Sequence, residues 1–381
     1  MRTSNHQGAT GARVSPGAAC YRLRVPEPAI ALQGVTPEEL SSLVPAISVE
    51  DARRIVSTVH RDGDVSEPSS VVRRVARQAV VERGHVPTLD VASREASALD
   101  PFIKLALRTH DGKLIETVRI PLERAGRFSV CVSSQVGCAL ACAFCATGRL
   151  GLGRNLETWE IVEQVRIVRR TLAPERSERV HGIVFQGMGE PLANLENVLG
   201  ALRVLTDPSA CAIDARKITV CTSGLPGGIR RLAVEAPRVR LGWSIGTALP
   251  AQRRSLMPID AAHPLEEVYA AAVEHARTTG LSPLWAVTLL SGVNDTDDDA
   301  RALSALAQRF LRDTGRMPRL SVIPYNRIAD DTSDPFRRSP DTSERRFRDT
   351  LHATGTFTHK RYSGGSDIGA ACGQLAARPA P

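Results

Sequence analysis

The stretch Cys131-Val-Ser-Ser-Gln-Val-Gly-Cys-Ala-Leu-Ala-Cys-Ala-Phe-Cys-Ala-Thr-Gly-Arg149 contains three closely spaced cysteines, Cys138, Cys142 and Cys145. An aromatic residue, Phe144, directly precedes the third of them. Three thiolates at this spacing can bind three corners of a cubic iron–sulfur cluster and leave the fourth iron without a protein ligand. Such an iron can bind and reduce a small molecule, and the protein then has to position that chemistry.

A zinc site is the alternative for the same three residues. Zinc takes four ligands, usually from paired C-x2-4-C segments. The other cysteines stand singly, at Cys20, Cys131, Cys211, Cys221 and Cys372. The sequence therefore offers no second pair, and the spacing favours an iron–sulfur cluster.

Length and composition indicate a globular protein of two or three domains. The chain has 381 residues, of which 42% are hydrophobic and 24% charged, enough to bury a large core. No apolar run reaches the roughly 18 residues of a membrane span, so we expect no membrane association. Clustered cysteines in a chain of this size suggest metal ligands in a reducing, cytoplasmic setting.

The net charge of +8 suits a polyanionic partner such as RNA. Aromatic residues make up only 4% of the chain, too few for a surface that stacks single-stranded bases. RNA contacts would then depend on arginines, with a solvated surface as the alternative for any single one. The candidates are Arg149, Arg154, Arg253, Arg254, Arg337, Arg338, Arg345, Arg346 and Arg361.

Four regions follow one another along the chain. We expect a disordered tail (1–33), a helical domain (34–95), a β-hairpin linker (96–127) and a barrel with a C-terminal cysteine loop (128–376). Thr36 before Pro37 and two glutamates predicts a helix start, as does Ser48 with Asp51. The Asp111-Gly112 pair between two β-type runs predicts the hairpin.

Strand and helix patterns alternate from residue 128 onward. The expected strands are 128–132, 182–186, 217–221, 239–245, 283–290 and 319–324, and the expected helices are 158–172, 195–206, 227–235, 265–279 and 298–313. This alternation predicts an α/β fold with a parallel sheet and right-handed crossovers. A partial (βα)6 barrel is its natural closure, with the chemistry at the C-terminal ends of the strands.

Glycines and polar residues follow all six expected strands. The three clustered cysteines follow the first strand, and Gly187-Met-Gly-Glu-Pro191 follows the second. Gly187 and Gly189 allow close approach of a ligand to the backbone, and Glu190 offers a carboxylate to an ammonium group. The alternative for Glu190 is an acid stabilised by a helix N-terminus.

Two single cysteines lie near this chemistry. Cys131 is on the first strand, and Cys372 lies in a glycine-rich segment between Gly369 and Gly373. A free cysteine usually behaves as a small buried hydrophobe. A thiol on a flexible or tightly turned loop beside a radical source is the functional alternative for Cys372.

Several motifs occur together in one order. They are C-V-S-S-Q-x-G-C-x3-C-x-F-C-x-T-G, F-x-G-M-G-E-P, R-x-L-M-P-I, G-V-N-D, I-P-Y-N and A-A-C-G-Q-L. From roughly Gly34 to Leu375 the chain resembles the RlmN/Cfr family of radical S-adenosylmethionine (SAM) adenosine methyltransferases. The resemblance implies a radical SAM barrel, a [4Fe-4S] cluster on Cys138, Cys142 and Cys145, and two SAM molecules per turnover.

The resemblance also implies roles for individual residues. SAM contacts are expected from Gly189, Glu190, Cys221, Ser244, Ile245, Gly246 and Asn326. One SAM methylates Cys372, and a second gives a 5′-deoxyadenosyl radical that removes hydrogen from this methyl group. The resulting methylene radical adds to adenine C2 or C8, and Cys131 resolves the adduct through a disulfide with Cys372. Glu116 matches the proposed proton acceptor, with an exposed strand carboxylate as the alternative.

Three positions depart from the family pattern. Cys221 and Gly246 stand where the family usually has serine and histidine. Gly364-Gly-Ser-Asp367 stands where the RlmN branch commonly has Arg-Gly-Asp-Asp, and its Gly-Ser-Asp is closer to the Cfr branch. The departures suggest a divergent, Cfr-like member and leave the modified carbon open.

The expected partners follow from this reading. They are RNA (23S rRNA, with tRNA as a further substrate) and an electron donor such as flavodoxin or ferredoxin, with the enzyme as a monomer. We expect the N-terminal helical domain to contact the RNA. The alternatives are a radical SAM methyltransferase with another substrate and a non-catalytic, zinc-stabilised RNA-binding protein.

Overall fold

The computed structural model describes residues 29–66, 71–328, 334–360 and 364–376. Residues 1–28 of the predicted N-terminal tail lie outside the described residues. Its last residues are ordered: β1 (Ile30–Ala31) pairs in parallel with β2 (Gly84–His85), and Leu32 is buried among the N-terminal helices. The prediction that the tail reaches residue 33 was therefore wrong, because Leu32 contributes to the core of the following helices.

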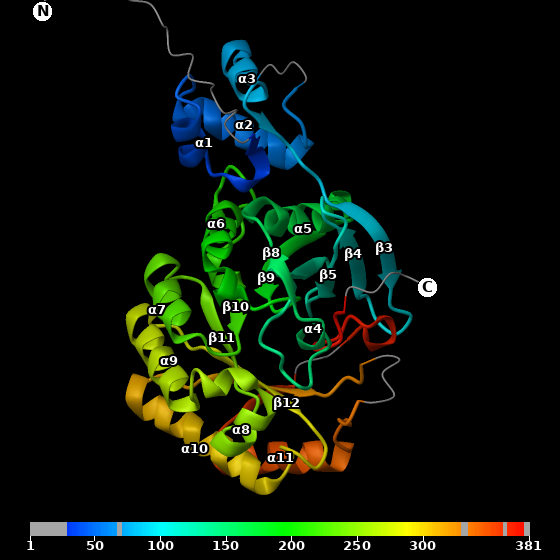
Figure 1. Cartoon of the computed structure of the whole chain (residues 1–381), viewed down its shortest axis with the longest axis vertical. Helices are drawn as coiled ribbons and strands as arrows, with labels where there is room; N and C mark the ends of the chain where they lie inside the picture. The colour runs from blue at the N-terminus through cyan, green and yellow to red at the C-terminus, as the bar shows by residue number, and fades with distance from the viewer. Residues whose placement is uncertain (1–28, 67–70, 329–333, 361–363, 377–381) are drawn as a thin grey trace, which may run out of the picture.

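Three helices form the N-terminal part of the molecule, above α5 and α6 in Figure 1. They are α1 (Pro37–Leu43), α2 (Val49–Asp62) and α3 (Arg74–Val81). Reciprocal hydrogen bonds cap α1 through Thr36 and Glu39 and α2 through Ser48 and Asp51, as the sequence predicts. Their apolar faces enclose a hydrophobic core of their own.

A buried polar contact joins these helices to the barrel. Arg166 on α5 donates from Nη2 to the Val59 carbonyl of α2 over 2.8 Å. Its Nη1 forms a 2.6 Å ion pair with Glu163, which is completely buried. A buried pair of this kind fixes orientation more than it adds stability. It therefore sets the position of α2 on the barrel.

A ten-stranded sheet forms the centre of the rest of the fold, in the order β14-β13-β12-β11-β10-β9-β6-β5-β4-β3. The parallel strands are β6 (Arg127–Val132), β9 (Arg179–Phe185), β10 (Ile218–Thr222), β11 (Arg240–Ser244), β12 (Leu284–Leu289), β13 (Arg319–Pro324) and β14 (Thr358–Lys360). The first six match the six predicted strands, and this partial barrel is confirmed. The short β14 was not foreseen.

The predicted hairpin extends this sheet instead of linking two domains. Strands β4 (Ile103–Arg108) and β5 (Leu114–Pro121) are antiparallel, and β5 pairs with β6 so that Val118 lies opposite Cys131. A further strand, β3 (Asp90–Ala96), pairs with the outer edge of β4. Residues 90–95, expected in the helical domain, therefore belong to the sheet.

Helices cover the outer face of the parallel strands (Figure 1). Helix α8 (Pro250–Leu256) is an exception, because its Leu256 packs beside the loop cysteines, with Cys142 and Tyr325. The covering helices are α5 (Thr158–Arg170), α6 (Leu195–Thr206), α7 (Pro226–Glu235), α9 (Leu265–Thr279), α10 (Asp297–Thr314) and α11 (Asp341–Ala353). The main hydrophobic core lies between these helices and the sheet. Among the described residues, no helix has the length and apolar character to cross a membrane.

Candidate active site

The three clustered cysteines lie on a loop that leaves and rejoins the barrel through two short antiparallel strands. These are β7 (Gln135–Gly137) and β8 (Leu152–Asn155). The Cys138 amide donates to the Gly151 carbonyl over 2.8 Å and closes the neck of the loop. Gly137 has φ +76°, and a Cβ there would overlap the Gly151 carbonyl. Only glycine fits at this position.

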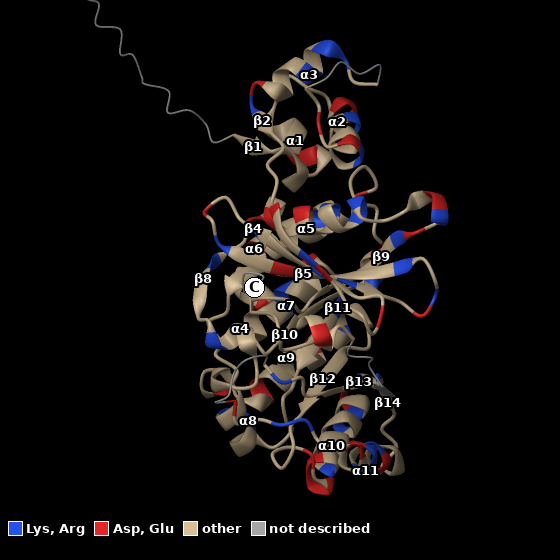
Figure 2. Ribbon diagram, turned by 90° about the vertical axis from the view of Figure 1, so that its right-hand side faces the viewer, with Lys and Arg blue, Asp and Glu red and all other residues tan. Residues whose placement is uncertain are grey.

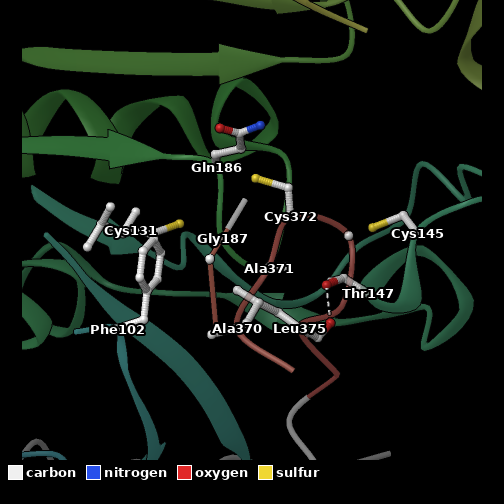
Figure 3. Close-up of a pocket in the computed structure, with 13 residues that line it drawn as sticks. Phe102, Cys131, Cys145, Thr147, Gln186, Gly187, Ala370, Ala371, Cys372 and Leu375 are labelled. Carbon is white, nitrogen blue, oxygen red and sulfur yellow. Dashed lines mark hydrogen bonds between the residues drawn. The ribbon is translucent and has the colours of Figure 1, made fainter. Parts of the chain in front are cut away.

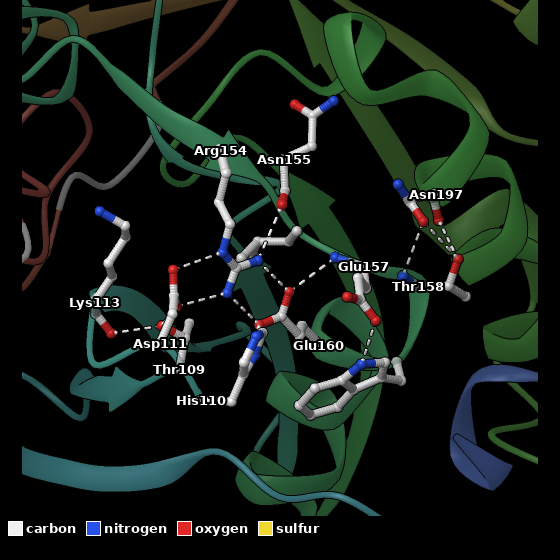
Figure 4. A network of polar contacts seen from close by, with 12 residues as sticks. Thr109, His110, Asp111, Lys113, Arg154, Asn155, Glu157, Thr158, Glu160 and Asn197 are labelled. Atoms are coloured by element: carbon white, nitrogen blue, oxygen red, sulfur yellow. Dashed lines mark hydrogen bonds and ion pairs between the residues drawn. The ribbon is translucent and has the colours of Figure 1, made fainter. Parts of the chain in front are cut away.

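A network around Arg154 fixes this neck to the rest of the sheet (Figure 4). Arg154 on β8 forms ion pairs with Asp111 in the β4–β5 turn (2.9 Å) and with the buried Glu160 on α5 (2.7 Å). Hydrogen bonds from the guanidinium hold the pKa of Asp111 well below its ordinary value. Arg154 is thus committed to two carboxylates, and its prediction as an RNA contact was wrong.

The loop cysteines open into a cavity of about 860 Å³, measured with its open mouth, at the C-terminal ends of the strands. Of the predicted SAM-binding residues, its wall contains Gly189, Glu190, Cys221, Ser244 and Gly246. Cys372 reaches the same cavity from the C-terminal segment. The side chain of Ile245 is instead fully buried, and Asn326 does not line the cavity. The structure therefore gathers most of the predicted site at one place.

The donor set fits an iron–sulfur cluster. Burial raises the pKa of the Cys138 thiol to about 11 and that of Cys142 to about 12. Thiolates at this depth would therefore need metal cations to stabilise them. Among the described residues, no three His, Cys, Asp or Glu side chains converge on the position of a single ion. The three thiols instead share a cavity, which has room for a group larger than one ion.

Glu190 is a buried carboxylate without a cationic partner in the described part of the chain. Its oxygens accept hydrogen bonds from the backbone amides of Leu192 (3.1 Å) and Ser223 (2.9 Å). Burial raises its pKa to about 7. A ligand ammonium group in the cavity would compensate this charge, which favours ligand binding over a purely structural role.

Arg253 holds two strand ends that border the cavity. It is completely buried, and its guanidinium donates to the carbonyls of Ser223 (2.7 Å) and Ile245 and pairs with Asp260 at 3.0 Å. Its prediction as an RNA contact was therefore wrong. This bracing role has no sequence signal, because a lone arginine in an Arg-rich chain is most often exposed.

Gly246 occupies a position where a side chain does not fit. Its φ is +73°, and a Cβ would lie 2.5 Å from Sδ of the buried Met257. The Gly246 carbonyl accepts a hydrogen bond from Asn294 Nδ2 over 2.9 Å. In this chain the Met257 side chain thus occupies the space that a side chain at residue 246, such as the family's histidine, would need. Only the backbone of Gly246 can therefore face a ligand.

A second cavity of about 570 Å³, also measured with its mouth, adjoins the first (Figure 3). Its wall contains Cys131 from β6 and Cys372 from the C-terminal segment. Cys372, Cys145, Thr147 and Gln186 line both cavities. Cys372 therefore lies at the boundary between the cluster cysteines and Cys131. The sequence analysis assigned no role to Thr147, which stands in the C-x-T-G motif, or to Gln186, which occupies the variable position of F-x-G-M-G-E-P.

Hydrogen bonds hold the segment around Cys372 in place. The Ala146 amide donates to the Gly373 carbonyl over 2.9 Å, and the Thr147 hydroxyl donates to the Leu375 carbonyl over 2.6 Å. Asn326, predicted to bind SAM, instead donates from Nδ2 to the Cys372 carbonyl over 3.4 Å. These contacts attach the segment to α4 (Ala146–Arg149) and to the end of β13.

Glu116 contacts the same segment rather than either cavity. Its buried carboxylate accepts a 2.8 Å hydrogen bond from the Ala376 amide and pairs with Lys104 at 3.2 Å. It is absent from the walls of both cavities. The alternative of an exposed strand carboxylate was wrong, because Glu116 is only 2% exposed.

Lys and Arg residues are interspersed with Asp and Glu residues along the ribbon (Figure 2). Arg149 pairs with Asp334 at 3.0 Å and Arg346 with Asp297 at 3.1 Å. Arg254 lies 3.7 Å from Asp260 but keeps 64% of its side chain exposed. Arg361 lies outside the described residues. Arg254 and Arg346, with 64% and 58% of their side chains exposed, are therefore better RNA candidates than Arg149, which is 30% exposed.

The partial barrel, the three thiols on the loop after its first strand and the buried carboxylate after its second define a radical SAM enzyme. A crystal structure of a radical SAM methyltransferase from Sphaerobacter thermophilus superposes with a TM-score of 0.81 at 36% identity, over 92% of this chain and all of that one. No protein-family model matches the chain.

Sequence relatives are consistent with this class. A probable RNA methyltransferase of Sorangium cellulosum is 57% identical over 358 residues, or 89% of this chain and 90% of the relative. A dual-specificity RNA methyltransferase RlmN of Anaeromyxobacter dehalogenans is 38% identical over 357 residues, or 92% of each chain. The chain belongs to the RlmN/Cfr family of radical SAM RNA methyltransferases. This membership removes the alternative of a non-catalytic zinc-stabilised protein.

Proposed function

We propose that the protein methylates C2 or C8 of an adenosine in 23S rRNA, with tRNA as a further substrate, through a methylated Cys372. The position of Cys372 is the main support for this proposal. Cys372 lines both the cavity that contains the cluster cysteines and the cavity that contains Cys131. A group bound to its sulfur could therefore be formed beside SAM and used beside the RNA base.

The first half-reaction takes place in the larger cavity. Glu190 binds the ammonium group of SAM, and the backbone around Ser244 and Gly246 lines the rest of that site. The Cys372 sulfur attacks the SAM methyl carbon, which releases S-adenosylhomocysteine and the thiol proton. Methyl-Cys372 is the product of this step.

The second half-reaction needs a second SAM molecule. A cluster on Cys138, Cys142 and Cys145 would supply the electron that cleaves SAM to methionine and a 5′-deoxyadenosyl radical. The Cys372 methyl group loses a hydrogen atom to this radical, and its carbon bonds to the adenine ring. The adduct then gives up one electron, which the oxidised cluster would take back, and loses the ring proton, for which Glu116 is the proposed acceptor.

Cys131 completes the reaction. Its thiolate attacks the Cys372 sulfur, the carbon–sulfur bond breaks, and the base keeps the carbon, which takes a proton to become a methyl group. The Cys131–Cys372 disulfide then needs two electrons from a thiol reductant. A one-electron donor such as flavodoxin or ferredoxin would reduce the cluster before the first cycle.

The RNA itself would extend beyond the cavities. We assign the α1–α3 region to RNA contacts because it forms a separate unit beside the barrel. An RNA substrate and reduced thiols suit a monomeric enzyme in the cytoplasm. A different methyl acceptor is the second candidate, favoured only by the altered residues Cys221, Gly246 and Gly364.

The variant Cys131→Ala tests this sequence of steps. With SAM, a reductant and 23S rRNA, it should methylate Cys372 and then accumulate a covalent RNA–protein adduct. The matched variant Cys211→Ala changes a fully buried cysteine outside both cavities and should turn over. Release of methylated RNA by Cys131→Ala would remove Cys131 from the mechanism.

A further inference from the structure

The described wall of the smaller cavity contains no charged side chain. None of the 13 residues that line it is an Asp, Glu, Lys or Arg. Apolar groups predominate, among them Phe102, Ile120, Ala371 and Leu375, and Gln186 and Thr147 add polar atoms. Figure 3 shows Phe102 and Cys131 on one side of this space and Cys372 on the other. A mostly apolar wall with a few polar groups is typical of a site for a neutral, flat ligand.

The chemistry of this wall distinguishes it from the larger cavity. The methionine end of SAM has an ammonium and a carboxylate group, which need charged or strongly polar partners such as Glu190. A nucleobase is neutral, and enzymes that modify a base usually move it out of the stack into a closely fitting pocket. The smaller cavity therefore suits the base, with the phosphates left outside.

Among the described residues of this wall, Phe102 is the only aromatic one. It lies directly before β4, and its ring fills the space beside Gly364. A Cβ at residue 364 would overlap the ring and would lie 2.6 Å from Asp100 Oδ2. The Phe102 ring thus fills the space that the side chain of a larger residue at position 364 would occupy.

Asp100 connects this ring to the Cys372 segment. Its Oδ1 accepts a hydrogen bond from the Phe102 amide (3.1 Å), and its Oδ2 accepts one from the Gly365 amide (2.9 Å). The ring and the start of the segment are therefore held by one carboxylate. Because Phe102 is only 5% exposed, its ring is fixed before any ligand arrives.

We propose that Phe102 is a substrate-binding residue of this chain, which stacks on the target adenine while the base lies between Cys131 and Cys372. This inference rests on the proposed function and adds the residue that positions the base. Stacking on an aromatic side chain is worth about 1–3 kcal/mol per base. Loss of the ring should then reduce methyl transfer to RNA by about 5- to 150-fold.

The test compares Phe102→Leu and Phe102→Tyr with the wild-type enzyme, after cluster reconstitution. Phe357→Leu serves as the matched control, since Phe357 is 74% exposed and belongs to neither cavity wall. Three quantities are measured: methylation of Cys372 without RNA, methylation of a transcribed 23S rRNA fragment, and protection of Cys131 from iodoacetamide by that fragment.

We expect Phe102→Leu to methylate Cys372 normally, to lose RNA methylation and to lose the protection of Cys131. Phe102→Tyr should restore both RNA-dependent results, and Phe357→Leu should match the wild type. Normal RNA methylation in Phe102→Leu, or an equal loss of Cys372 methylation, would overturn the inference. If the wild type methylates no adenosine, the proposed function fails. If RNA then still protects Cys131 in the wild type but not in Phe102→Leu, the base-binding role of Phe102 is supported. If RNA does not protect Cys131 in the wild type, that role is rejected.

Discussion

Replacing Glu190 by glutamine should weaken SAM binding without unfolding the protein. Glutamine keeps one oxygen, which can accept one of the two hydrogen bonds that the separate Glu190 oxygens accept from the Leu192 and Ser223 amides. Losing the other bond should cost about 1–3 kcal/mol of folding stability. It removes the charge that we assign to the SAM ammonium group. A hydrogen bond to a charged group contributes about 1.5–3 kcal/mol, so the dissociation constant for SAM should rise by about 10- to 150-fold.

The pH dependence of SAM binding gives a second measure of the same contact. The pKa of Glu190 is raised to about 7 by burial, so its binding-competent carboxylate form is lost as the pH falls through 7. For a single group with this pKa, SAM affinity should fall about tenfold between pH 8 and pH 6. The glutamine variant has no group to titrate at this position and should lose most of that dependence.

Isothermal titration calorimetry of SAM on the reconstituted protein at pH 6, 7 and 8 measures both effects. Glu196→Gln is the matched control, because Glu196 lies on α6 with 76% of its side chain exposed. The control should bind SAM as the wild type does. Unchanged affinity in Glu190→Gln, or an affinity that is independent of pH in the wild type, would refute this assignment.

Three further predictions concern the architecture of the site. Gly246→Ala should lower the free energy of unfolding by about 2–5 kcal/mol, because residue 246 has a left-handed backbone and an added Cβ would overlap Met257. Urea denaturation of Gly246→Ala, Met257→Ala and the double variant should show coupling between the two positions. Additive losses of stability would argue against an overlap with Met257. Cys138→Ala should lose cluster iron and SAM cleavage together, and full iron content by chemical analysis would contradict the cluster assignment. Arg154→Met should cost about 3–5 kcal/mol because Glu160 stays buried without its partner. Equilibrium unfolding measures that loss, and a selective loss of RNA affinity at unchanged stability would instead restore Arg154 as an RNA contact.

The parallel part of the sheet could be predicted from the sequence because its signals are local. Strands β6, β9, β10, β11, β12 and β13 each coincide closely with an expected apolar run. The polar residues that follow them meet at one edge because parallel strands all end on the same side. That topological rule brought Glu190, Ser244 and the loop cysteines together before any coordinates were considered.

Other features depend on contacts between distant residues and had no local signal. Strand β5 pairs with β6, but the residue pattern of β5 would suit a hairpin separate from the barrel sheet equally well. Arg253 reads as a surface residue until Asp260 and two carbonyls are seen around it. Phe102 gains its place from Gly364, which is 262 positions away in the sequence. Such pairs are decided by packing in three dimensions, so no motif reveals them.

The most direct test of the account uses SAM with a trideuterated methyl group. The reconstituted enzyme is incubated with this SAM, a one-electron donor and 23S rRNA, and the nucleosides are analysed by mass spectrometry. Hydrogen removal from methyl-Cys372 takes one deuterium, so the account predicts 2-methyl- or 8-methyladenosine with two deuterium atoms. Methyladenosine with all three would indicate direct transfer and contradict the role of Cys372, and the absence of labelled adenosine would reject the proposed substrate.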